Sequence, residues 1–448
     1  MSRESTIAPP DYPRVLVPPA ALAVHLAIGQ AYAFSVFNLP LTKLIGLDHS
    51  APGDWNLKEV GWTFSIAIAI LGLSAAVFGR WVERVGPRKA MFVSALCFGS
   101  GFIVAALGVH YHALLMIYFG YGVLGGCGLG IGYISPVSTL IKWFPDRPGL
   151  ATGLAIMGFG GGALIAAPLS VMLMAHFKTP TSNGVLETFV TLGVIYFMYM
   201  MIGVYSARVP APGWTPAGWT PPANTAKLVT RAQVAVDRAW RTPQFWLLWI
   251  VLCMNVTAGI GVIGTASPMI QEIFAGRVNA QAAAAFVSLL SLFNMIGRFF
   301  WASTSDYIGR RNTYMIFFAL GMVLYFSVPS LARTGSLPLF VAAFVIILSM
   351  YGGGFATIPA YLRDIFGTMH VGAIHGRLLT AWAVAGVVGP NLVSYIRDYE
   401  LKNGVPKAQV YSLTMYIMCA FLLVGLICNI CMRPVHEKYQ YTGGGSAS

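Results

Sequence analysis

An apolar run in the C-terminal part of the chain carries three polar residues whose spacing could support ligand binding. Ser291, Asn294 and Arg298 fall at positions i, i+3 and i+7, so a helix would place them on one face. A charged side chain inside a membrane-spanning helix costs at least about 2.5–3.5 kcal/mol, so it is retained where it faces water, a partner or a ligand. The planar guanidinium of arginine matches a carboxylate and can bind it through two charge-assisted hydrogen bonds.

Two other interpretations of Arg298 remain open from the sequence. Its guanidinium could be satisfied by helix carbonyls, or it could reach back to the membrane surface, because it lies roughly two turns from the following loop. No acidic residue lies within one turn of it, and none lies in the middle of another apolar run. An unpaired positive charge of this kind matches a monoanion. A dianion would leave one charge unpaired, which costs several kcal/mol.

His25 is the one histidine that the sequence places deep in an apolar run. Histidine has an ordinary pKa near 6.5, which suits a group that takes up and releases a proton near neutral pH. Tyr32 lies seven residues later and shares the same helical face. We therefore expect His25 to be a proton-coupling candidate, with a packing histidine as the open alternative.

The elements that must position these residues are membrane helices. The chain of 448 residues is 57% hydrophobic and 10% charged, against roughly 25% charged in an average soluble domain. Runs of about 20 apolar residues recur along its length, and each is long enough to cross a bilayer. The predicted spans are residues 15–39, 58–82, 88–109, 113–142, 148–176, 187–208, 244–274, 281–305, 313–332, 336–362, 370–396 and 408–432.

One long connection divides these spans into six and six, the two-halves layout of a class of secondary transporters. An internal repeat supports the division, since GRWVERVGPRK at residues 79–89 and DYIGRR at residues 306–311 follow the second span of each half. The expected parts are a tail (1–14), a first half (15–208), a linker (209–243), a second half (244–432) and a tail (433–448) that ends in linker-like residues 443–448. The fold class is thus an all-α membrane protein of twelve transmembrane helices in two six-helix halves.

The net charge of +13 has a topological explanation. Lysine and arginine are concentrated in the segments that share a side with both termini, which the positive-inside rule places in the cytoplasm. A nucleic-acid partner is therefore not expected. Cys428 and Cys431 form a CxxC in an apolar run with no further ligand nearby, so no metal site is expected.

The glycine clusters at residues 125–130 and 158–162 do not predict a nucleotide cofactor, because neither lies in a βαβ unit. Gly122, Gly126 and Gly130 repeat every fourth residue, which instead favours close helix packing. No cofactor is expected. The chain also shows no recognisable catalytic triad, metal cluster or nucleotide loop, so an enzyme is not expected either.

Four segments carry a family resemblance. The loop at residues 79–89 resembles the signature loop of the major facilitator superfamily. KWFPDRPGLA at residues 142–151 resembles the loop between the fourth and fifth spans of monocarboxylate transporters and oxalate/formate-antiporter-like proteins. RTPQFW at residues 241–246 and DIFG at residues 364–367 are typical of the same branch, and the resemblance covers essentially residues 15–432.

The resemblance implies a functional arginine at Arg298 and a central cavity between the halves. It places Tyr32, Tyr133, Tyr351 and Phe355 along that cavity, although each could also be a packing aromatic. Eukaryotic monocarboxylate transporters carry an aspartate where this chain has Asn294, which puts proton coupling by an Asp–Arg pair in doubt. Oxalate-type carriers carry a second cation in the eleventh span, and our alignment puts Trp382 at that position.

The sequence and the resemblance together predict a multi-pass cell-membrane transporter of a short monocarboxylate such as L-lactate, coupled to a proton. The expected partners are the substrate, the proton and the lipid bilayer, with no obligate protein partner. An anion exchanger of oxalate/formate type is the alternative. A carboxylate sensor would need a signalling domain, and the chain shows none appended to its spans.

Overall fold

The computed structural model describes residues 6–9, 11–47, 49–219, 230, 232–278 and 280–441. Within these ranges the chain is helical apart from short connections and three isolated β-bridges. The predicted linker-like residues 443–448, and part of the predicted N-terminal tail, lie outside the described residues.

The first half consists of six long helical segments joined by short loops. The opening segment bends from an α-helix into a 3-10 helix at Gly29. In chain order the elements are η2 (Arg14–Leu16), α1 (Val17–Ile28), η3 (Gly29–Phe37), α2 (Asn38–Leu41), α3 (Leu57–Val85), α4 (Pro87–His110), α5 (Leu114–Ile117), η4 (Tyr118–Gly125), α6 (Gly126–Trp143), α7 (Pro148–Phe177) and α8 (Val185–Ser206).

The second half repeats this arrangement after the linker, which holds one short helix. Its penultimate span is interrupted at Leu379 and therefore consists of two helices. In chain order the elements are α9 (Val236–Ala239), α10 (Pro243–Ile273), α11 (Ala280–Ile308), α12 (Arg310–Arg333), α13 (Leu337–Phe366), α14 (Val371–Leu378), α15 (Thr380–Lys402), α16 (Ser412–Ile430) and η5 (Glu437–Tyr439).

Eleven helical segments of the described chain are long and apolar enough to cross a membrane. The 29 residues of α11 would extend over roughly 44 Å at about 1.5 Å per residue, which makes α11 the twelfth long helix of this part of the chain. The predicted all-α membrane fold is thus confirmed. The predicted ends shift by a few residues, because a hydropathy pattern does not register the caps that begin and end a helix.

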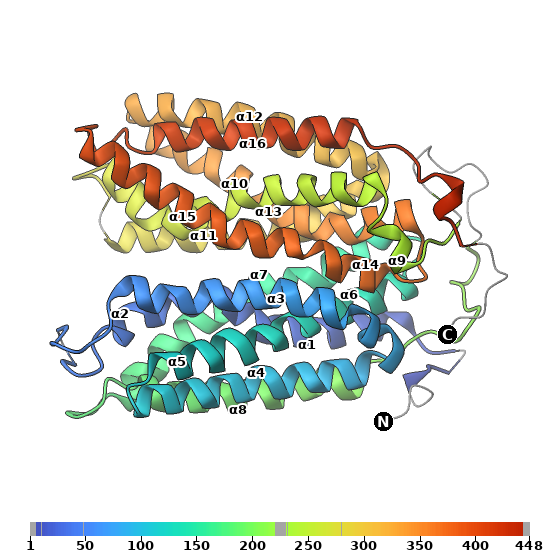
Figure 1. Ribbon diagram of the computed structural model, residues 1–448, viewed down its shortest axis with the longest axis horizontal. Helices are drawn as coiled ribbons and strands as arrows, with labels where there is room; N and C mark the ends of the chain where they lie inside the picture. The colour runs from blue at the N-terminus through green and yellow to red at the C-terminus, as the bar shows by residue number, and fades with distance from the viewer. Residues whose placement is uncertain are drawn as a thin grey trace.

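The two halves form two layers, with α1–α8 below and α10–α16 above in Figure 1. The linker and both ends of the described chain lie at one end of the bundle. There, the Ala8 amide donates to the Val209 carbonyl (2.9 Å) and the Tyr441 amide donates to the Gln233 carbonyl (2.7 Å). We call this the linker end and the opposite one the far end. A cytoplasmic position of the linker end stays a prediction.

The repeated loop forms the same turn in both halves. Gly86 follows α3 with φ 81°, and Gly309 follows α11 with φ 86°. This left-handed backbone region favours glycine, which has no Cβ. The equal turn geometry supports the interpretation of the two loops as one duplicated unit.

Glycines bring helix backbones into direct contact, both within and between the halves. Within the first half, a Cβ on Gly130 would lie 2.3 Å from the Leu71 carbonyl oxygen, so the predicted close packing of this glycine series is confirmed. Between the halves, α7 packs on α11, where a Cβ on Gly153 would lie 2.9 Å from the Arg298 carbonyl oxygen. Likewise α3 packs on α14, where a Cβ on Gly376 would lie 2.1 Å from the Ala75 carbonyl oxygen.

Candidate substrate-binding site

Arg298 lies on α11 with no exposed surface. Its Nε donates to the Asn294 side-chain oxygen (3.1 Å) and its Nη1 donates to the Ile156 carbonyl (3.3 Å). Its Nη2 finds no hydrogen-bond partner in the described part of the chain. The side chain therefore does not reach the membrane surface, and a helix carbonyl satisfies only one of its donors.

The positive charge of Arg298 lies against aromatic rings rather than a carboxylate. The guanidinium carbon is 5.6 Å from the ring centroid of Phe159 and 5.4 Å from that of Phe355. The ion pairs of the described residues do not include Arg298. Cation–π contacts offset part of the desolvation cost, but they leave the charge without a counter-ion. The site is therefore complementary to an anion.

Four aromatic side chains from both halves form one cluster at this charge, and two of them, Phe159 and Phe355, contact it directly. We call the four the aromatic cage. Tyr133 of α6 and Phe159 of α7 come from the first half, whereas Phe355 of α13 and Trp382 of α15 come from the second. Neighbouring ring centroids are 4.5–5.7 Å apart, and all four residues are fully buried. The Tyr133 hydroxyl and the Trp382 indole nitrogen lack hydrogen-bond partners among the described residues. The cage thus holds two uncommitted polar groups beside the free Nη2 of Arg298.

Tyr32 and Tyr351 join the two halves next to the cage. The hydroxyl of Tyr32, on η3, lies 3.3 Å from that of Tyr351, on α13. Tyr32 packs edge-on to Phe159 at 4.9 Å, and Tyr351 packs edge-on to Phe355 at 5.3 Å. The structure therefore brings every aromatic residue that the sequence proposed for the cavity into one cluster around Arg298.

His25 lies on α1 and is fully buried. Its ring centroid is 5.4 Å from that of Tyr133, a member of the cage. Its Nδ1 is 2.6 Å from the Ala155 carbonyl oxygen, and its Nε2 is 3.2 Å from the Tyr133 carbonyl oxygen. Both ring nitrogens are thus committed to backbone acceptors of α6 and α7. A proton-coupling role for His25 stays a prediction.

Sequence reasoning missed two residues of this region. Phe159 lies in the glycine cluster of α7 that we interpreted only as a packing surface, where it is the single large side chain. His375 lies on α14 and is 1% exposed, with both ring nitrogens unpartnered among the described residues. Its ring centroid is 5.8 Å from that of Tyr133. The predicted span began at residue 370, so His375 was counted as an edge residue rather than a deep one.

The comparison with known families agrees with this architecture. The sequence model of the family described as Major Facilitator Superfamily matches residues 20–390 and 257–446 of the chain. The chain belongs to the Major Facilitator Superfamily. It is accordingly a membrane transporter rather than an enzyme, as the sequence predicted.

Curated relatives of this superfamily member include carboxylate carriers. It is 27% identical over 376 residues to the oxalate:formate antiporter of Oxalobacter formigenes, covering 83% of this chain and 82% of the relative. It is 26% identical to apicoplast pyruvate carrier 1 of Toxoplasma gondii, with 73% and 68% covered. It is 20% identical to human monocarboxylate transporter 14, with 94% and 91% covered. The predicted resemblance to the monocarboxylate and oxalate/formate branch is thus confirmed.

Solved structures agree with the fold. The structure of the proton:xylose symporter XylE, bound to 6-bromo-6-deoxy-D-glucose, matches this chain with a TM-score of 0.66 at 14% identity. The match covers 92% of this chain and 96% of XylE. At this level of identity the likeness supports the major facilitator fold alone.

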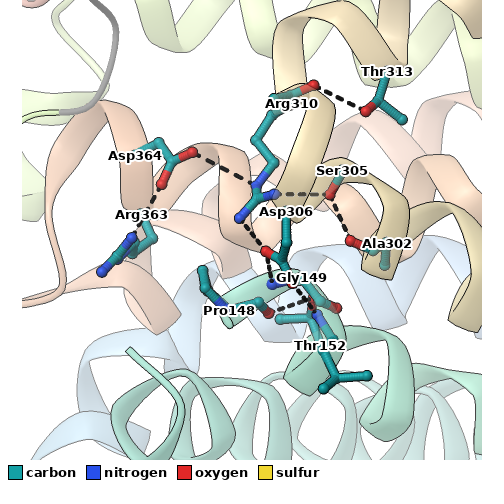
Figure 2. Close-up of polar contacts among 12 residues, drawn as sticks. Pro148, Gly149, Thr152, Ala302, Ser305, Asp306, Arg310, Thr313, Arg363 and Asp364 are labelled. Carbon is teal, nitrogen blue, oxygen red and sulfur yellow. Dashed lines mark hydrogen bonds and ion pairs between the residues drawn. The ribbon is translucent and has the colours of Figure 1, made fainter. Parts of the chain in front are cut away.

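A polar network joins α7, α11, α12 and α13 at the linker end of this major facilitator fold (Figure 2). The Asp306 carboxylate of α11 accepts hydrogen bonds from the Gly149 amide (2.9 Å) and the Leu150 amide (2.8 Å) at the start of α7. A carboxylate is stabilised at a helix N-terminus by these free amides and the helix dipole. Arg310 holds Asp306 in place through a 2.5 Å ion pair. Thr152 adds a hydrogen bond to the Ala356 carbonyl of α13 (2.7 Å).

A hollow of about 1040 Å³ lies at the linker end between the two halves. Ser135 and Ser138 of α6 line it, together with Glu83 of α3, Lys142 and His370. Lys142 pairs with Glu83 at 2.6 Å. Burial lowers the pKa of His370 below its ordinary value, so this histidine is neutral at neutral pH. The hollow is therefore lined by polar and charged side chains at the linker end.

Proposed function

We propose that this transporter carries a short monocarboxylate such as L-lactate together with a proton, by alternating access, and that Arg298 pairs with the substrate carboxylate. The observation that carries the proposal is the buried guanidinium with a free Nη2 and no carboxylate partner in the described chain. The other proposed substrate-binding residues are Asn294, Tyr32, Tyr133, Tyr351, Phe355 and Trp382.

The charge of the cage supports a monoanion. Arg298 is the cation in contact with the cage rings, and the predicted position of a second cation holds Trp382, which is uncharged and packs on Phe355 at 4.5 Å. A second carboxylate in such a site would be desolvated without a partner, at a cost of several kcal/mol. The apolar rings suit the short aliphatic part of a monocarboxylate, while the Tyr133 hydroxyl and the Trp382 N–H can bind its oxygens.

Membrane energetics support coupling. Moving one anion inward against about 100 mV costs roughly 2.3 kcal/mol, so accumulation needs a co-transported proton or an exchanged anion. Asn294, the polar neighbour of Arg298, can orient the guanidinium but cannot carry a proton. Exchange without a proton is the alternative function, which the relationship to an oxalate:formate antiporter favours.

Alternating access is supported by how the halves meet. The contacts between them run from the cage to the linker end, where α7 meets α11 and α3 meets α14. An empty carrier in which both ends are closed would hold the Arg298 charge unpaired in a desolvated core. A bound carboxylate offsets that charge, so substrate favours the reorientation step.

Uptake into proteoliposomes tests this proposal. Purified protein should accumulate labelled L-lactate when the outside is acidic and the vesicles hold no anion, whereas a strict exchanger needs an internal anion. A panel of C1 to C4 monocarboxylates and oxalate as competitors defines the substrate class. Arg298→Lys keeps the charge but removes the bidentate geometry, and we expect at least about a tenfold loss of affinity because hydrogen bonds to charged groups contribute about 1.5–3 kcal/mol. Near-normal lactate uptake by Arg298→Ala would refute the assignment.

A further inference from the structure

His375 is a buried imidazole that no described residue satisfies. It lies on α14 with 1% of its surface exposed, and neither Nδ1 nor Nε2 has a hydrogen-bond partner among the described residues. Its ring is tilted against that of Tyr133, with centroids 5.8 Å apart. The Tyr133 hydroxyl also has no hydrogen-bond partner in the described part of the chain. Leaving a buried polar group unsatisfied costs about 1–3 kcal/mol, so its retention requires an explanation.

We propose that His375 is the proton-binding residue of the transport cycle, an inference that rests on the proposed proton-coupled function. A neutral imidazole can accept a proton at one nitrogen and already donates from the other. His375 has both nitrogens uncommitted, whereas both nitrogens of His25 face backbone carbonyls at 2.6 and 3.2 Å. His375 can therefore change its protonation state without breaking a hydrogen bond to the protein.

The position of His375 gives it a route to water. Gly372 lies one turn before it on α14, and a Cβ there would be 2.7 Å from the Ser138 Cβ. Ser138 and Ser135 line the hollow at the linker end, and the Ser135 hydroxyl is buried without a partner in the described chain. Ser138 thus lies between the hollow and the part of α14 that carries His375, and Ser135 lines the same hollow one turn away on α6. Proton transfer requires such hydrogen-bonding groups or waters along its path.

The substrate and the proton are coupled through charge. Arg298 contacts Phe159 at 5.6 Å, Phe159 contacts Tyr133 at 5.7 Å, and Tyr133 contacts His375. A proton on His375 would add a second positive charge to this core while Arg298 is unpaired. When a carboxylate neutralises Arg298, that repulsion disappears and a proton on His375 is favoured. The anion and the proton therefore bind with positive cooperativity.

Other titratable groups on the elements packed against α14 do not provide a counter-charge beside the imidazole. The Glu83 carboxylate of α3 lies against Gly372 and is already paired with Lys142. The Asp237 carboxylate of α9 is paired with Arg377 at 3.1 Å. Further titratable groups on these elements include Arg80 and Arg84 of α3, Tyr133 of α6, and Arg363 and Asp364 of α13. Arg80 pairs with Asp237, and Arg363 pairs with Asp364. His370 precedes α14, and His25 lies on α1.

Proteoliposome uptake of labelled L-lactate by His375→Gln tests the inference, and His25→Gln tests the competing candidate. A pH difference of one unit can drive about tenfold accumulation by a one-to-one symporter, since a tenfold ratio corresponds to about 1.4 kcal/mol. We expect wild type and His25→Gln to accumulate lactate and His375→Gln to reach about onefold, the equilibrium level. Lactate counterflow at equal pH should persist in His375→Gln, because the anion site is intact.

Each outcome decides between the two proposals. If wild type accumulates no lactate under the pH gradient, the proposed proton-coupled function fails whatever the variants do. If wild type and His375→Gln accumulate lactate equally, that function stands and the role of His375 is rejected. Loss of accumulation in His25→Gln with retention in His375→Gln would assign the proton to His25.

A second variant and a second measurement keep the inference testable if His375→Gln does not fold. Proton uptake on addition of L-lactate can be followed with a pH-indicator dye in weakly buffered, detergent-purified protein, comparing wild type, His25→Gln and His375→Asn. We expect His375→Asn, monodisperse on gel filtration, to take up no proton while it still binds lactate. Proton uptake equal to that of wild type would overturn the inference.

Discussion

The hydroxyl of Tyr32 in the first half lies 3.3 Å from that of Tyr351 in the second half, directly beside the aromatic cage. Each ring also packs edge-on against a phenylalanine that contacts Arg298. The tyrosine pair therefore links the contact between the halves to the charge that we propose binds the substrate.

Removal of one hydroxyl of this pair should loosen the contact. A neutral hydrogen bond contributes about 0.5–1.5 kcal/mol, so Tyr32→Phe or Tyr351→Phe should change the ratio of open to closed protein by up to about tenfold. Spin-label distances between the halves measure this ratio. The double variant should show little further change, since either single change removes the same bond. Additive effects would show that the two hydroxyls act independently.

Arg298→Ala should abolish transport without unfolding the protein. The guanidinium is buried with one free nitrogen and no counter-ion in the described chain, so its removal relieves a desolvation cost rather than breaking an ion pair. We expect a thermal unfolding temperature equal to or above that of wild type, with no further rise on adding L-lactate. A large fall in the unfolding temperature would indicate a structural arginine.

Trp382→Lys should change the substrate from a monocarboxylate to a dicarboxylate. The change puts a second cation into the cage, where Trp382 packs on Phe355 and its N–H is unpartnered among the described residues. Oxalate should then compete with uptake at least about tenfold better, because a charged hydrogen bond contributes about 1.5–3 kcal/mol. Trp382→Gln, which adds a polar group without charge, is the control and should show no such gain.

Asp306→Asn should weaken closure at the linker end. The Asp306 carboxylate accepts two amides at the start of α7 and pairs with Arg310. Capping and helix-dipole interactions of this kind contribute about 0.5–2 kcal/mol, and an amide keeps only part of them. Cysteine accessibility at the linker end should therefore rise in the variant. Asp398→Asn is a suitable control, because Asp398 is largely exposed and lies outside this network.

Asp146, in the loop before α7, should make the protein less stable to heat as the pH falls toward 3. Burial opposes ionisation of Asp146, but hydrogen bonds from Arg14 (2.6 and 3.0 Å) outweigh it and hold the pKa of this carboxyl below its ordinary value. A carboxyl with a lowered folded pKa stabilises the protein above its ordinary pKa of about 4, and this contribution is lost as the pH falls through the folded value. Thermal unfolding from pH 7 to pH 3 measures it. The acid-induced loss should be smaller in Asp146→Asn than in wild type.

The sequence predicted those parts of the site that depend on one helix at a time. Arg298 and Asn294 are four residues apart, and the structure confirms that they share a face, since their side chains are hydrogen-bonded. Helical spacing could not show that Tyr133 and Trp382 meet, because that depends on how the two halves dock. Family resemblance supplied these residues instead. The contact between Asp306 and Gly149 also depends on how the halves dock, and no sequence pattern near either residue predicts it.

His375 was missed for a different reason. A hydropathy window treats residues 370–396 as one span, whereas the structure has α14 and α15 with a break at Leu379 and an end at Lys402. His375 is buried because α14 packs against α3 and α6, and a hydropathy pattern along one segment does not report such contacts. Phe159 was missed because its glycine-rich stretch was interpreted only as a surface for close helix packing. That interpretation does not predict where the one large side chain in the stretch lies.

The close contact between Gly153 and the Arg298 carbonyl has a consequence for how this protein can change. A Cβ at residue 153 would lie 2.9 Å from that oxygen, so the turn of α11 that holds the binding charge also rests directly on the opposing half. A larger residue there would meet the backbone of α11 at Arg298, so the contact between α7 and α11 would have to shift. With Arg298 in its proposed role, we expect substitutions at Gly153 to change substrate affinity and turnover number together.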